Sequence, residues 1–301
     1  VIAGYFALLM LAKREPAVWL KGRFLRLGLP FVASLVMLVP FMNLVCELSN
    51  FPLPEALRSW AANSLTSGGY WVRHLWFLIV LLYFCTAAAF VVMCAPNLKN
   101  AFSERSLDGW AARHFLIVLL VLGAIVGAWE ALVLEGFYKA GLATLVPQQI
   151  LRLDEVIIYM PWFVLGSVLA RAQRTMERMR CFQVPVVLIA FVSTILWFAV
   201  YRDAHPMVER FVGAFAALAI TQVIISVACS VLDRPMPVVR RLTDASFVIY
   251  LFHLPLITLW VWLAQPLTIA PILKALGALV LSFIGSYVIW LVIRRSRILT
   301  L

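Results

Sequence analysis

The stretch at residues 75–95 reads LWFLIVLLYFCTAAAFVVMCA and contains no charged residue. A helix needs about 20 mostly apolar residues to cross the hydrocarbon core of a bilayer, so this stretch is long enough to span one. Its apolar residues run without the alternation of a barrel strand, which favours a helix over a membrane β-barrel. We therefore expect residues 75–95 to form a transmembrane helix.

Eight similar segments flank this stretch and cover most of the chain. They lie at about 1–12, 27–46, 114–134, 155–170, 184–201, 211–232, 246–264 and 272–293. Of the 301 residues, 64% are hydrophobic and 13% are charged, whereas a soluble domain is nearer half apolar and about a quarter charged. The sequence therefore predicts an all-α, polytopic transmembrane helix bundle with nine spans, forming a single domain over residues 1–301.

The basic residues, which give the chain a net charge of +11, are distributed unevenly among the loops. Five, three, four, three and three Lys or Arg residues lie in the alternate loops 13–26, 96–113, 171–183, 233–245 and 294–301. The intervening loops hold six, so the positive-inside rule places the basic set, and the C-terminus, in the cytoplasm. The basic blocks are thus explained as membrane loops, and no nucleic-acid partner is predicted. With nine spans Val1 lies outside, so one further upstream helix would complete a bundle of ten.

The sequence lacks the usual motifs of several enzyme classes. Its five cysteines form no CxxC pair, so neither a disulfide nor a metal site is predicted. It contains no Walker loop, dinucleotide glycine fingerprint, HExxH or GxSxG motif. ATP-driven transport, NAD chemistry and zinc proteolysis are therefore not indicated, and no bound cofactor is expected.

Two arginines precede the segment 27–46. Arg23 and Arg26 are three residues apart, so on a helix they share one face, at the expected cytoplasmic surface. Paired guanidinium groups are suited to hold the phosphates of an acyl carrier. Spacing alone also allows ordinary anchoring of the loop by positive charge.

A histidine lies at the expected outer mouth of the segment 75–95, in the run Arg73-His74-Leu75-Trp76-Phe77-Leu78. Imidazole exchanges protons near neutral pH, so His74 is a candidate general base or acid. The alternative is a residue of the interfacial belt that binds lipid headgroups.

Another histidine lies within the membrane, in the run Tyr250-Leu251-Phe252-His253-Leu254-Pro255. His253 is about two turns inside its segment. Pro255 lacks the backbone N–H that would pair with the carbonyl of Leu251, which disturbs the helix locally. His253 therefore either lines a polar cavity or bonds to a neighbouring helix.

Glu130 lies one to two turns from the outer end of the segment 114–134. A carboxyl group in lipid is costly, which makes Glu130 a candidate functional group on the outer side. The alternative is that its side chain reaches the polar interface.

Four runs of residues, in this order, resemble motifs of the membrane-bound acyltransferase-3 family. The runs are Ala3-Gly4-Tyr5-Phe6-Ala7, Arg23 to Arg26 followed by Pro30, His74-Leu75-Trp76-Phe77-Leu78, and Tyr250-Leu251-Phe252-His253. They are similar to the family's serine-glycine-tyrosine-phenylalanine, arginine-x-x-arginine-proline, histidine-leucine-tryptophan-phenylalanine-leucine and tyrosine-leucine-x-histidine motifs. The resemblance spans nearly the whole chain, and the neighbourhood of the loop 47–74 looks most like the glucan biosynthesis branch.

The resemblance implies an enzyme of the bacterial cytoplasmic (inner) membrane that moves an acyl group, acetyl or succinyl. The donor would be a cytoplasmic thioester of the acyl-coenzyme A type, and the acceptor a hydroxyl of an exported or periplasmic carbohydrate. Arg23 and Arg26 would bind the donor. The acceptor side would hold Arg73, Trp76 and Glu130, and the catalytic centre His74, His253 and Tyr250. The expected partners are membrane lipid, the donor and the carbohydrate, and no oligomeric state is predicted.

The chain departs from the family pattern at two places. The family's first helix carries an arginine and a histidine, the latter taken as the catalytic base, and neither has a counterpart here. We therefore expect the first of ten helices to be missing and the fragment itself to be inactive. Ala3 stands where the family usually has serine.

Two functions of other classes stay open. One is a transporter or flippase for an anionic or lipid-linked solute, with His74, Glu130 and His253 lining its path, although no internal repeat supports it. The other is a non-catalytic membrane partner in a polysaccharide-export complex.

Overall fold

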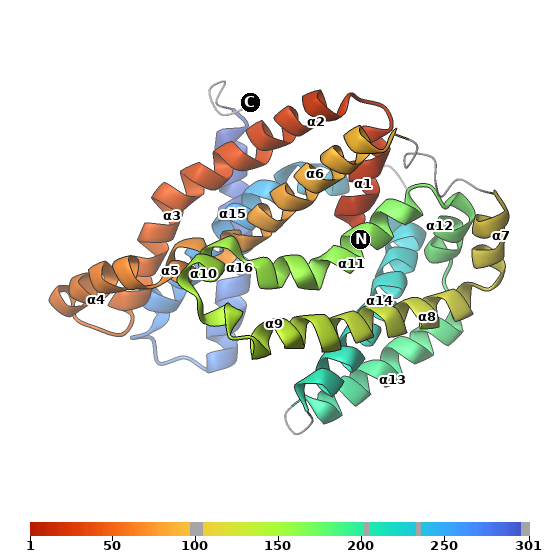
Figure 1. Cartoon of the computed structure of the whole chain (residues 1–301). Helices are drawn as coiled ribbons and strands as arrows, with labels where there is room; N and C mark the ends of the chain where they lie inside the picture. The colour runs from red at the N-terminus through yellow and green to blue at the C-terminus, as the bar shows by residue number, and fades with distance from the viewer. Residues whose placement is uncertain (97–104, 202–204, 233–235, 296–301) are drawn as a thin grey trace. The chain divides into compact units, whose positions relative to one another are not determined.

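The structure is a computed structural model that describes residues 1–96, 105–201, 205–232 and 236–295. Within these ranges it contains helices and turns but no strand (Figure 1). The predicted all-α fold is therefore confirmed.

In the part of the chain that the structure describes, six helical stretches are long and apolar enough to cross a membrane. They are Pro16–Leu48, Tyr70–Cys94, Phe115–Lys139, Pro206–Leu232, Pro237–Ala264 and Pro271–Ile293. A seventh span results if Val146–Leu169 and Gln173–Arg180, which meet at a bend of 110°, are taken together. These stretches agree with six of the predicted spans.

The nine predicted spans are not confirmed. The expected segments 1–12, 155–170 and 184–201 do form helices, namely α1 (Ile2–Leu11), α11 (Leu153–Leu169) and α13 (Val184–Val200). They are only 10, 17 and 17 residues long. A span usually needs about 20 apolar residues, so length alone does not establish that these three cross.

The chain divides into two compact units. Unit 1 comprises Val1–Arg23, Val80–Leu145 and Arg152–Arg234, and unit 2 comprises Phe24–Ile79, Val146–Leu151 and Pro235–Leu301. The single domain expected over residues 1–301 stays a prediction.

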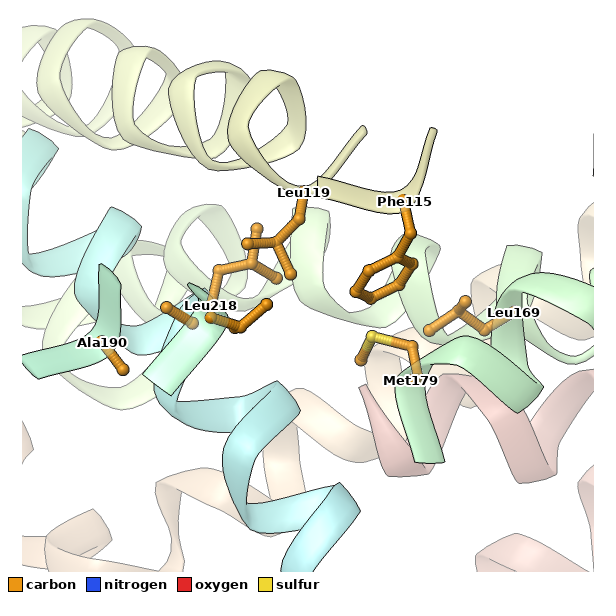
Figure 2. Packing of buried hydrophobic residues seen from close by; sticks show 8 residues of the cluster. Phe115, Leu119, Leu169, Met179, Ala190 and Leu218 are labelled. Atoms are coloured by element: carbon orange, nitrogen blue, oxygen red, sulfur yellow. The ribbon is translucent and has the colours of Figure 1, made fainter. Parts of the chain in front are cut away.

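Unit 1 has an apolar core formed by five helices. They are α8 (Phe115–Trp129), α11, α12 (Gln173–Arg180), α13 and α14 (Pro206–Leu232). Figure 2 shows Phe115 and Leu119 of α8 facing Leu218 of α14 and Met179 of α12, with Ala190 and Leu169 at either side. The amphipathic helix α12 is thus held on the ends of the longer helices by Met179, while its charged residues stay outside.

Helix α1 crosses α11 at two glycines. A Cβ added at Gly4 would lie 1.9 Å from the carbonyl oxygen of Phe163, and one added at Gly166 would lie 1.8 Å from that of Val1. Both distances are far inside van der Waals contact, so only glycine permits this backbone approach. Gly4, part of the run Ala3-Gly4-Tyr5-Phe6, therefore has a packing role.

A carboxylate joins α12 to the short helix α7 (Arg105–Arg113). The Oδ2 atom of Asp108 accepts a hydrogen bond from the backbone N–H of Arg174 at 2.9 Å. Its Oδ1 atom accepts one from the N–H of Thr175 at 2.9 Å and one from the Thr175 hydroxyl at 2.8 Å. Burial alone would raise the pKa of Asp108, but these hydrogen bonds outweigh burial and hold the pKa below its ordinary value.

We expect Asp108→Asn to destabilise unit 1 by about 1 kcal/mol at neutral pH, because Asp108 serves as the N-terminal cap that α12 lacks in its own sequence. The folded-state pKa is lowered, so the stabilisation is complete above the unfolded-state pKa of about 4 and is lost as the pH falls through the folded-state value. Thermal unfolding at several pH values measures this. The difference between native protein and variant should shrink in acid, whereas Asp244→Asn, at an exposed position, should show none at any pH.

Candidate functional site

Unit 2 brings together three residues from distant parts of the sequence. His74 lies in the short 3-10 helix η2 (Arg73–Leu75), and Tyr250 and His253 lie on α15 (Pro237–Ala264). The ring centroid of His74 is 5.8 Å from that of His253 and 5.9 Å from that of Tyr250. The rings of Tyr250 and His253 are 6.0 Å apart, and all three side chains are partly buried. We call these three residues the histidine cluster.

A backbone carbonyl left free by proline holds His74. Pro255 lies inside α15 and has no N–H, so the carbonyl of Leu251 lacks its usual partner one turn later. The Nε2 atom of His74 lies 3.1 Å from this carbonyl oxygen. Because a carbonyl only accepts hydrogen bonds, Nε2 must carry the proton. In the neutral imidazole the other nitrogen, Nδ1, is then an unprotonated acceptor, and it is buried without a hydrogen-bond partner among the described residues.

The second imidazole is oriented in the same way by its own helix. The Nδ1 atom of His253 lies 2.7 Å from the carbonyl oxygen of Tyr250 and 3.2 Å from that of Ile249. Both partners are acceptors, so in the neutral imidazole Nδ1 carries the proton and Nε2 has the free lone pair. Each histidine therefore presents one basic nitrogen.

The side chain of Tyr250 contacts the backbone of His74. Its hydroxyl donates a hydrogen bond to the carbonyl oxygen of His74. The phenolic proton is thereby engaged and holds η2 against α15, and the catalytic role of Tyr250 stays a prediction. The ring of Phe77, on α6 (Trp76–Cys94), lies 5.7 Å from the Tyr250 ring.

The residue before His74 has an unusual backbone conformation. Arg73 has a φ angle of 44°, in the left-handed region that non-glycine residues seldom adopt. Its Nε atom donates to Oδ1 of Asn43 at 2.8 Å, and its guanidinium lies 4.8 Å from the centre of the Tyr70 ring. Asn43, on α3 (Leu29–Leu48), is only 2% exposed and also donates from Nδ2 to the Tyr70 carbonyl at 2.7 Å. A strained backbone persists only where its surroundings hold it, and Asn43 does this for Arg73.

A buried carboxylate, that of Glu47, extends the hydrogen bonds that Asn43 forms with Arg73 and Tyr70. Oε1 of Glu47 accepts hydrogen bonds from the Tyr70 hydroxyl and from Nδ2 of Asn63, each at 3.0 Å. These contacts tie α3 to α4 (Leu53–Thr66) and α5 (Gly68–Val72). Asn43, Glu47 and Tyr70 are not among the site residues predicted from the sequence, although polar residues in or beside an apolar segment were the signal that could have found the first two.

We expect Asn43→Ala to destabilise the protein by about 1–3 kcal/mol, because it leaves the Arg73 Nε and the Tyr70 carbonyl without partners in a buried site. Thermal unfolding in detergent measures this change. Asn50→Ala is the matched control, since Asn50 makes an exposed hydrogen bond from Nδ2 to the Cys46 carbonyl on the same helix. Equal unfolding temperatures for the two variants would contradict the role given to Asn43.

The other predicted site residues lie outside the histidine cluster or in unit 1. Arg26 is exposed in the π-helix η1 (Phe24–Gly28) of unit 2 and forms no described hydrogen bond or ring contact with the cluster. Arg23 belongs to unit 1, where its guanidinium lies 5.4 Å from the centre of the Trp19 ring. Trp76 begins α6 and is partly buried. The donor-binding and acceptor-side roles of these residues stay predictions.

Glu130 belongs to unit 1. It begins the π-helix η4 (Glu130–Leu134), and its Oε1 atom accepts a hydrogen bond from the Trp162 indole at 3.3 Å. π-Helical turns occur often at functional sites, but this contact equally satisfies a carboxyl group within an apolar helix. Its acceptor-side role stays a prediction. Among the described residues, no group of three or more His, Cys, Asp or Glu side chains is placed to hold a metal ion.

Comparison with known proteins identifies one family that covers most of the chain. A family model described as an acyltransferase domain matches residues 1–291. Two proteins named glucans biosynthesis protein C, from Escherichia coli O1:K1 / APEC and from E. coli O45:K1 (strain S88 / ExPEC), are 24% identical over 272 residues, covering 85% of this chain and 67% of theirs. The protein of that name from Shigella dysenteriae serotype 1 (strain Sd197) is 24% identical over 176 residues, covering 56% of this chain and 43% of its own. No solved structure matches.

Proposed function

The chain belongs to the acyltransferase-3 family, and on that premise we propose that it is a membrane O-acyltransferase. The acyl group, acetyl or succinyl, would pass from a cytoplasmic acyl-coenzyme A type donor to a hydroxyl of an exported or periplasmic carbohydrate. The observation that carries this proposal is the histidine cluster. There, a buried imidazole nitrogen of His74 has a free lone pair and no partner of its own among the described residues.

The chemistry requires a base of this kind. As the acceptor oxygen bonds to the thioester carbonyl carbon, its proton must leave, and we propose that Nδ1 of His74 takes it, rather than the histidine that the family pattern places in the first helix. The carbon–sulfur bond then breaks, and the proton passes to the leaving sulfur to give the free thiol. His253, whose ring lies edge-on to His74, offers a second basic nitrogen within the same cluster. A substrate hydroxyl at Nδ1 would also satisfy a buried nitrogen that otherwise lacks a hydrogen bond.

The proposed topology has nine spans, with α1, α11 and α13 included. Helices of 17 residues are at the short end of the spanning range of about 17–25, which admits α11 and α13. The basic loops and the C-terminus would then face the cytoplasm of a bacterial inner membrane. Arg23 and Arg26 would meet the phosphates of the donor on that side, and Arg73, Trp76 and Glu130 would serve the acceptor side.

The names of the relatives support a glucan as the acceptor. Proteins called glucans biosynthesis protein C match most of this chain, and the chain spans about two thirds of the longest-matching ones. At 24% identity these matches support the carbohydrate class more than a particular sugar.

The test uses the full-length gene. It is deleted and then restored, and periplasmic and surface carbohydrates are examined by mass spectrometry for acyl groups that mild alkali removes. An ester-linked acyl group that disappears on deletion and returns with the intact gene supports the proposal. Carbohydrates that are identical in all strains would overturn it, and uptake of labelled solute by vesicles would then test the transporter.

A further inference from the structure

Helix α4 of unit 2 presents an apolar stripe on its surface. Leu53, Leu57, Ala61 and Leu65 are four residues apart, so they lie on one side of the helix. All four are exposed, and the leucines are exposed to 57%, 44% and 88%. Single apolar residues are common on protein surfaces, whereas a continuous stripe of them indicates an apolar partner.

A second side of α4 is fixed to α3. Ala56 is fully buried, and Nδ2 of Asn63 donates to Oε1 of Glu47 at 3.0 Å. The indole Nε1 of Trp60 donates to the carbonyl oxygen of Pro40 at 3.2 Å. Pro40 lies about two turns before the end of α3, so the Trp60 side chain reaches back along that helix. These contacts hold α4 against the end of α3.

The third side of α4 is polar. At about 100° per residue, Glu55, Arg58 and Thr66 lie beyond the stripe and away from the side that contacts α3. All three are exposed. A helix whose exposed surface is divided between an apolar side and a charged side is suited to the boundary between lipid and water.

We propose that α4 lies in the plane of the membrane at its boundary with water. The stripe of Leu53, Leu57, Ala61 and Leu65 contacts the hydrocarbon of the bilayer, and the side with Glu55 and Arg58 faces water. The third side packs on α3 through the contacts described above. The proposal goes beyond acyl transfer and does not depend on it.

The neighbours of α4 in the chain favour lipid as its apolar partner. The helix joins Pro16–Leu48 to Tyr70–Cys94, and both of these stretches are long and apolar enough to cross a membrane. Both ends of α4 therefore start from a membrane boundary. On α3, the exposed residues Val36, Met37 and Phe41 are also apolar, so α4 follows a surface that already suits lipid. The side chains of the stripe offer no hydrogen-bonding group, which a carbohydrate would need.

This arrangement bears on the position of the histidine cluster. Nε1 of Trp71, on α5, donates to the carbonyl oxygen of Ser64 on α4 at 2.7 Å. Helix α5 leads directly into η2, which carries His74. Anchoring of α4 in the interface therefore fixes the depth of η2 relative to the membrane.

Spin labels on the full-length protein, reconstituted in nanodiscs of phosphatidylethanolamine and phosphatidylglycerol, test the proposal. The native cysteines are replaced, and single nitroxide labels are attached in Leu57→Cys and Leu65→Cys on the stripe. Glu55→Cys and Arg58→Cys are the matched controls on the polar side of the same helix. The ratio of collisions with oxygen to collisions with a water-soluble nickel complex should be about tenfold higher on the stripe than in the controls, because oxygen concentrates in lipid.

Two results would overturn the proposal. Equal ratios at the four positions would show that α4 lies wholly in water or wholly in lipid. Exclusion of both reagents from the stripe would show that protein covers it, for example a second copy of this chain.

A second measurement needs no variant. Hydroxyl-radical footprinting of the unmodified full-length protein in the same nanodiscs should show Leu65 protected from oxidation, although the protein itself leaves it 88% exposed. Oxidation of Leu65 at the rate that this exposure implies would place the stripe in water and would contradict the proposal.

Discussion

His74→Gln should lower the rate of acyl transfer by about 10²–10⁴-fold in the full-length enzyme, the usual contribution of a general base. Glutamine keeps an N–H that can donate to the carbonyl of Leu251, as Nε2 of His74 does. It has no nitrogen lone pair that can take a proton. The variant therefore removes the proposed base and keeps the contact that holds it, so its thermal stability should stay close to that of the native protein.

The measurement is single-turnover transfer of a labelled acyl group to carbohydrate, together with thermal unfolding. His114→Gln is the matched control, because His114 is exposed between α7 and α8 in unit 1. It should leave the rate unchanged. Native rates for His74→Gln would show that another group takes the proton, and the assignment of Nδ1 as the base would fail.

Pro255→Ala should make the protein more stable and less active. Proline inside a helix costs about 3 kcal/mol, so alanine should raise the unfolding temperature. The new N–H of residue 255 would compete with His74 for the carbonyl of Leu251. Loss of a buried hydrogen bond of about 1–1.5 kcal/mol corresponds to about a tenfold lower rate, because His74 then no longer keeps its proton on Nε2 and its lone pair on Nδ1.

The tautomer is measured directly by ¹⁵N NMR of histidine-labelled protein, which is practical because this chain has four histidines. The Nε2–H form of His74 should be lost in Pro255→Ala. Pro161→Ala, which removes a proline inside α11 of unit 1, should raise stability with no change in rate or in the His74 signal. An unchanged tautomer and rate in Pro255→Ala would show that the freed carbonyl does not orient His74.

These opposite effects separate a functional proline from a structural one. A proline outside the site, such as Pro161, should change stability without changing the rate, whereas one that sacrifices helix stability to orient a base should change the two in opposite directions. The prediction for Pro255 therefore tests the site without relying on loss of folding.

The number of spans illustrates the limit of composition. All nine segments predicted from hydrophobic length are helical in the described part of the chain, because the hydrocarbon core sets how many apolar residues a span contains. It did not establish whether α1, α11 and α13 cross the membrane. A helix shorter than the bilayer depends on its neighbours, as α1 does where Gly4 and Gly166 bring it against α11.

The sequence by itself determined the helical class and the distribution of basic loops, and it determined that the Leu251 carbonyl would lack its helical partner. These are local properties, set by apolar length, by charge and by the missing N–H of Pro255. Only the tertiary structure decided that His74 takes that carbonyl and that Asn43 and Glu47 support the strained Arg73 beside it. Such contacts join residues far apart in the chain, and no local pattern specifies which distant donor meets which acceptor.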